Sequence, residues 1–98
     1  MNDKELYQQK KQTQLNEWKT GMIQFRTQAF AARTDMQLEL NRHVKLLEGK
    51  LDEGKLKLAE LVKMTGHSFE SAKKNFEIMW DTIQVSFTDT ATKFKTLS

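Results

Sequence analysis

The stretch LNEWKTGMIQFRTQAFAARTDM, residues 15 to 36, decides the fold of this chain. Its apolar residues recur in alternating steps of three and four, namely Leu15, Trp18, Met22, Phe25, Ala29, Ala32 and Met36. This spacing places them on one face of an α-helix and is typical of a coiled-coil seam. The stripe continues through Leu40, Val44, Leu47, Leu51, Gly54, Leu58 and Leu61, and then through Phe69, Ala72, Phe76, Trp80, Ile83 and Phe87. We therefore predict an all-α fold without β-structure.

The composition favours long helices in one small domain. The chain has 98 residues, with no Pro, four Gly, 38% hydrophobic residues and 30% charged residues. A chain of this length makes one domain at most, and the lack of Pro allows helices to run without interruption. We expect residues 1–98 to form a single helical coiled-coil domain.

The position of the turn is less well marked than the helices. Pairs of stripe residues whose numbers sum to 98, such as Trp18 with Trp80, favour an antiparallel pairing centred near residue 49. This pairing has two solutions, a helical hairpin within one chain or an antiparallel dimer of two long helices. For the hairpin, which we favour, we predict one helix over about 3–48, a turn near 49–54, and a second helix to about residue 90. Residues 65–68 are the alternative turn, with Gly66 as a helix C-cap and Ser68 as an N-cap.

A narrow two-helix core in so small a chain predicts self-association into a homo-oligomer, through dimers or four-helix bundles. The residues expected to form the assembly seam are Leu15, Trp18, Met22, Phe25, Phe76, Trp80 and Ile83. Beside the seam, the expected partner face consists of Lys19, Ile23, Arg26, Phe30 and Arg33. In the hairpin, Glu70, Glu77 and Asp81 would supply the acids opposite these cations.

The function predicted from these features is a non-enzymatic structural or protein-interaction module. A basic helix face leaves open binding to nucleic acid, and amphipathic helices leave open a membrane or granule coat. The net charge of +3, whose whole surplus lies in residues 1–50, is small for a dedicated nucleic-acid protein.

The sequence contains few residues or motifs that could carry out catalysis or bind a cofactor. There is no Cys, and the segment GKLDEGK at 49–55 is followed by Leu56 where a phosphate-binding loop needs Ser or Thr. Glu39 and His43 share one helical face, but two ligands are too few for a metal site. We expect no enzyme activity, cofactor or metal. The chain also lacks a long apolar run and a signal peptide, so we expect it in the cytoplasm.

Several residues together resemble a group of short, uncharacterised bacterial coiled-coil proteins, some of which are labelled stress-response proteins. The matching residues are Tyr7, the run Leu15-Asn16-Glu17-Trp18, and Trp80. A middle motif departs from the pattern, because the segment 64–69 keeps Gly66 and an aromatic residue at Phe69 but lacks the tryptophan and its flanking alanines. The resemblance implies a helical, non-enzymatic protein, in some members connected with stress, and it supplies no site residues.

Overall fold

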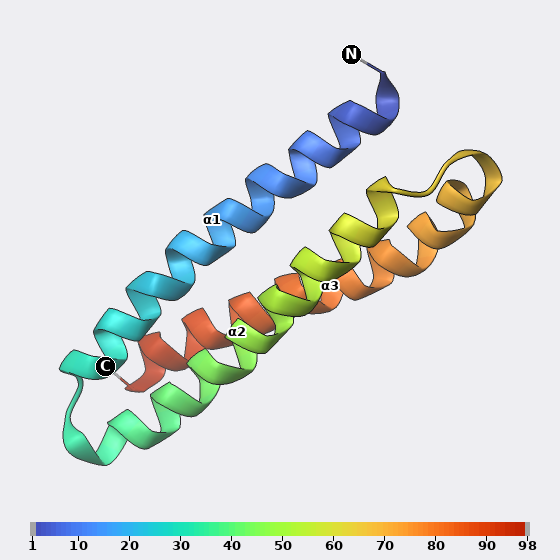
Figure 1. Cartoon of the computed structure of the whole chain (residues 1–98). Helices are drawn as coiled ribbons and strands as arrows, with labels where there is room; N and C mark the ends of the chain where they lie inside the picture. Colours follow the sequence, from blue (N-terminus) through green and yellow to red (C-terminus); the bar gives the residue numbers. More distant parts are fainter. Residues whose placement is uncertain (1, 98) are drawn as a thin grey trace.

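The computed structural model describes residues 2–97, and in this range the chain is all-α with three helices and no strand (Figure 1). Helix α1 is Asp3–Ala31, α2 is Thr34–Val62 and α3 is Gly66–Leu97. Successive helices are antiparallel, so α1 and α3 run in the same direction, and each of the three helices packs against the other two (Figure 1). The result is an elongated bundle with extents of 51 × 22 × 17 Å.

The structure confirms one predicted turn and corrects the other. The chain leaves α2 at Val62 and re-enters a helix at Gly66, so a turn lies at 63–65, slightly before the alternative predicted at 65–68. The C-cap of α2 is Lys63, and Gly66, predicted as that cap, is instead the first residue of α3. Gly66 has a φ of +57°, a conformation that costs L-residues with a Cβ, although Ser68 lies inside α3 and does not cap it. Residues 49–54 lie in the middle of α2, so the prediction of a turn there was wrong.

The prediction of a single helix over 3–48 was also wrong, because the chain turns at Ala32 and Arg33. Both residues have extended ψ angles, 163° and 145°. The side-chain nitrogen of Gln37 donates to the carbonyl oxygens of Phe30 and Ala32, at 2.9 and 3.0 Å, and so satisfies acceptors that the end of α1 leaves open. Three helices of about equal length cover one another better than two longer ones, and this burial outweighs continued helical bonding through residue 32.

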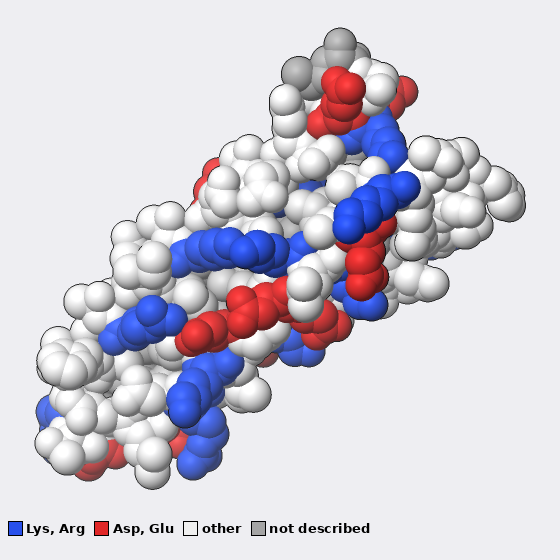
Figure 2. Space-filling view, in the orientation of Figure 1, with Lys and Arg blue, Asp and Glu red and all other residues white. Residues whose placement is uncertain are grey.

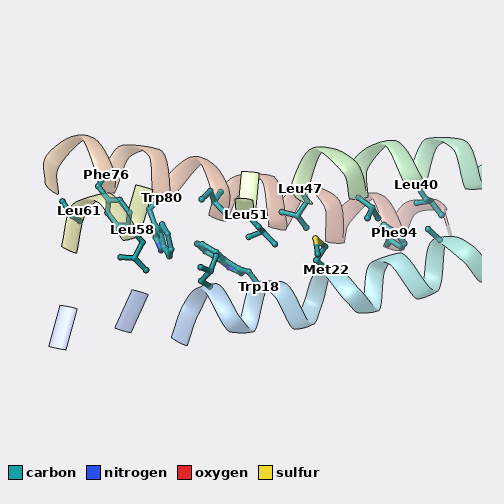
Figure 3. Close-up of a cluster of buried hydrophobic side chains, with 14 of the residues drawn as sticks. Trp18, Met22, Leu40, Leu47, Leu51, Leu58, Leu61, Phe76, Trp80 and Phe94 are labelled. Carbon is teal, nitrogen blue, oxygen red and sulfur yellow. The ribbon is translucent and has the colours of Figure 1, made fainter. Parts of the chain in front are cut away.

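The predicted seam forms the core of this bundle within one chain. Leu15, Trp18, Met22, Phe76, Trp80 and Ile83 are buried, and Phe25 packs against them. Figure 3 shows Trp18, Met22, Phe76 and Trp80 in this core. Helix α2 supplies the middle of the core with Leu40, Val44, Leu47, Leu51, Leu58 and Leu61. At Gly54 an added Cβ would lie 2.6 Å from Ile83 Cδ1, so the missing side chain lets α2 and α3 approach closely.

Aromatic side chains bridge α1 and α3 at a constant offset. Tyr7 contacts Phe69, Trp18 contacts Trp80 and Phe25 contacts Phe87, with ring centroids 6.1, 5.1 and 5.2 Å apart. In each pair the residue numbers differ by 62, as parallel helices require. The expected contact between Trp18 and Trp80 is present, but the antiparallel pairing about residue 49 from which it was predicted is wrong.

Candidate functional site

A polar and aromatic cluster joins α1 to α3 near the start of both helices. The Tyr7 hydroxyl donates a hydrogen bond to a carboxylate oxygen of Glu77, and Lys11 Nζ lies 3.3 Å from the same carboxylate. Burial, reinforced by the Glu77 carboxylate, raises the pKa of Tyr7 above its usual range. Lys73 Nζ lies 4.7 Å from the centre of the Tyr7 ring. Each polar group here has a partner within the chain, so the cluster holds the helices together.

The predicted partner face lies on α1, but its cations have partners inside the chain. Arg26 binds Glu48 of α2 at 3.0 Å, and Arg33 binds Asp35 at 3.2 Å. The other members differ: Lys19 is half-buried, while Ile23 and Phe30 are 55% and 85% exposed. The off-seam position of these two apolar residues is therefore as predicted.

The acids expected to pair with Lys19 and Arg26 do not form ion pairs with them. Glu77 binds Tyr7 and Lys11, and Arg26 takes its partner from α2. The pairing of Arg26 and Lys19 with Glu70, Glu77 and Asp81 was wrong, since it assumed an antiparallel α3. Figure 2 shows basic and acidic side chains next to one another on the visible face. This face therefore lacks the continuous basic patch that favours phosphate binding.

Two hollows that the sequence did not reveal lie between α2 and α3, and we call them together the outer groove. One hollow of about 320 Å³ is lined by His43, Leu46, Thr82, Val85, Ser86, Asp89 and Thr90. A second, of about 310 Å³, is lined by Glu53, Lys57, Glu60, Leu61, Met64, Ala72, Asn75, Phe76 and Met79. Leu46 and Val85 are 61% and 58% exposed. Apolar side chains in this groove thus remain open to water.

The outer groove lies on the side of α2 and α3 that α1 does not cover. On α2, Glu48 faces α1 through its bond to Arg26, and Leu46 is two residues away, about 200° round the helix. On α3, Gln84 faces α1 through a 3.4 Å hydrogen bond to Gln14, and Thr82 is likewise two residues away. Helix α1 therefore covers one face of the pair formed by α2 and α3, and the opposite face is open.

A separate cleft lies where the end of α1 and the start of α2 meet the last turns of α3. It measures about 670 Å³ and is lined by Phe25, Gln28, Ala31, Ala32, Arg33, Met36, Leu40, Ala91, Phe94 and Lys95. Its walls are mainly apolar, with two cations among the lining residues. The lining residues include no hydroxyl or thiol nucleophile, and no carboxylate or imidazole for proton transfer.

The residues considered as metal ligands lie in a small polar group with Lys93. The Glu39 carboxylate lies 3.5 Å from His43 Nε2 and 3.7 Å from Lys93 Nζ. Within residues 2–97, no three His, Asp or Glu side chains gather closely enough to hold a metal ion. Among the three helices described, none has the length and apolar character needed to cross a membrane.

Comparison with known proteins adds no relative, because no family model, curated protein or solved structure matches the chain. The interpretation of its surfaces therefore rests on their geometry and chemistry.

Proposed function

We propose that this chain is a non-enzymatic helical interaction module that self-associates through the outer groove and acts in the cytoplasm. The supporting observation is the open groove itself, in which the exposed side chains of Leu46 and Val85 lie on two closely packed helices. Such side chains on a rigid surface gain free energy when a partner removes them from water. The resemblance to bacterial coiled-coil proteins suggests a role connected with stress.

Association through the coiled-coil seam receives no support from the structure, since Trp18, Trp80 and Ile83 are already buried within one chain. The two other classes also receive less support than self-association. For nucleic acid, Arg26 and Arg33 each contact a carboxylate, which reduces the positive charge available to phosphates. A membrane or granule coat requires a continuous apolar face, and on the face that Figure 2 shows, cations and acids interrupt the apolar surface.

The test is the mass of the protein in solution. Sedimentation equilibrium of the wild-type chain should give a dimer or a larger species that dissociates on dilution. Leu46→Glu combined with Val85→Glu should yield a monomer of unchanged helicity, because two charges would then have to be buried in the interface. Ile23→Glu on α1 is the control and should leave association unchanged. A wild-type chain that stays monomeric up to high micromolar concentration would refute the proposal.

A further inference from the structure

We infer that a second copy of this chain covers the outer groove about a twofold axis, with α2 antiparallel to the partner's α2 and the axis passing level with residue 55. This inference rests on the proposed self-association and specifies its face and its axial register. It would build a four-helix core from α2 and α3 of both copies, with each α1 on the outside.

The order of side chains on α2 carries the inference. On the side of α2 toward the groove, residues recur at helical spacing as Leu46, Lys50, Glu53, Lys57 and Glu60, and Met64 continues the series two residues beyond the end of the helix. All of them except Lys50 line the two hollows of the groove. In an antiparallel pair of α2 helices centred on position 55, each residue of this series lies opposite a partner residue of matching chemistry. Apolar Leu46 then meets the partner's Met64, and each charged residue meets its opposite: Lys50 meets the partner's Glu60, and Glu53 meets the partner's Lys57.

A parallel arrangement of the two α2 helices has the opposite outcome. Each residue would then face its own copy, so that Lys50 meets the partner's Lys50 and Glu53 meets the partner's Glu53. Like charges placed opposite each other at an interface are strongly unfavourable. The charge pattern therefore selects the antiparallel pairing over the parallel one.

Helix α3 supports the same axis through different residues. Gly54 lies against Ile83, and α2 and α3 are antiparallel, so residue 55 is level with residue 82. About position 82, Met79 is opposite the partner's Val85, and Asn75 is opposite the partner's Asp89, which can accept a hydrogen bond from the Asn75 amide. Thr82 is a small side chain on the axis itself. One axis thus brings compatible residues together on both helices.

The face is large enough for a stable dimer, and its charges are free to rearrange. The bundle extents of 51 × 22 Å limit the broad face to about 1,100 Å², which exceeds the roughly 800 Å² per partner of a standard interface. Lys57 binds Glu60 at 3.6 Å, its one ion-pair partner among residues 2–97, and both side chains are more than half exposed. Such a pair contributes little to stability, so its exchange for pairs across the interface is easy.

Two charge variants test the inference. Glu53→Lys with Glu60→Lys makes the four central charges of the stripe all positive, and Lys50→Glu with Lys57→Glu makes them all negative. Each variant alone should dimerise about a hundredfold more weakly than the wild type. A mixture of the two in equal amounts should recover the dimer as a heterodimer, detected by native mass spectrometry. Glu17→Lys with Glu70→Lys, which changes the net charge equally at exposed positions outside the groove, is the matched control and should dimerise normally.

The axial register can be tested by disulfide cross-linking, because the chain contains no Cys and an introduced Cys can pair only with its own copy in the partner. Thr82→Cys should form a disulfide-linked dimer under mild oxidation, since the axis brings the two positions close together. Thr20→Cys, on the exposed side of α1, should not. If both charge variants dimerise as tightly as the wild type, or if Thr82→Cys does not cross-link, this face and register are wrong while self-association stands. A monomeric wild type would overturn self-association and this inference together.

Discussion

Replacement of Trp80 by Ala tests the core most directly. The Trp80 side chain is 2% exposed, and its ring lies 5.1 Å from that of Trp18 and 4.9 Å from that of Phe76. Its indole nitrogen also donates a 2.6 Å hydrogen bond to Gln14. The residue therefore ties α3 to α1 and fills the space beside Gly54 of α2, where an added Cβ would lie 3.3 Å from the indole ring.

The expected loss in the free energy of unfolding is about 3–5 kcal/mol. A buried Trp side chain removes about 200 Å² from water, which at about 25 cal/mol per Å² is worth roughly 5 kcal/mol. Partial collapse of the cavity recovers some of this, and large-to-small core substitutions of this kind cost about 3–5 kcal/mol. A chain of this length has a total stability of about 5–15 kcal/mol, so the variant loses a substantial part of it.

The assay is urea unfolding followed by circular dichroism, with the wild type and the variant at the same protein concentration because association would add to stability. Ile78→Ala is the control, since Ile78 is 66% exposed and its truncation should change stability by less than about 0.5 kcal/mol. A loss below about 1 kcal/mol for Trp80→Ala would refute the placement of this ring in the core.

Three further substitutions test the helix boundaries and the polar cluster. Gly49→Ala should stabilise the chain by about 1 kcal/mol, because position 49 is in the middle of α2 with open space around it; a loss of thermal stability would point to a turn there. Gly66→Ala should destabilise by about 1 kcal/mol, since its φ is +57°, and an unchanged urea midpoint would argue against that conformation. Tyr7 has a raised pKa in the folded chain, so its contribution is complete below about pH 10 and is lost as the pH rises further. The stability advantage of the wild type over Tyr7→Phe should therefore shrink in alkaline titration, whereas a constant difference would show that folding does not raise the pKa of Tyr7.

The break at residue 32 shows how a strong periodic pattern can hide a turn. Ala32 continues the spacing of the stripe, and neither Gly nor Pro stands near it to end a helix. The available signal was the sequence Thr34-Asp35-Met36-Gln37, which has the spacing of a helix N-terminal motif. Gln37 uses its side chain differently, since it bonds back to carbonyl oxygens at the end of α1.

The outer groove was hidden for another reason. Lys50, Glu53, Lys57 and Glu60 have the alternating charges of an ordinary solvated helix face. Their position beside an open groove depends on which side of α2 and α3 is covered by α1, and that is decided by contacts between distant segments. Ile23 and Phe30 could be assigned an exposed position from sequence because they lie off the stripe of their own helix.

The sequence by itself determined the helical fold and the face that each helix buries, and it offered the turn near Gly66 only as an alternative to the turn near 49–54. These properties follow from residue spacing and propensity within a few turns of helix, which are local. Only the tertiary structure decided that there are three helices, that α1 and α3 are parallel, and that one face of α2 and α3 stays open. These depend on the burial gained when segments about 60 residues apart pack together, as Trp18 and Trp80 do, and residue spacing alone does not specify that gain.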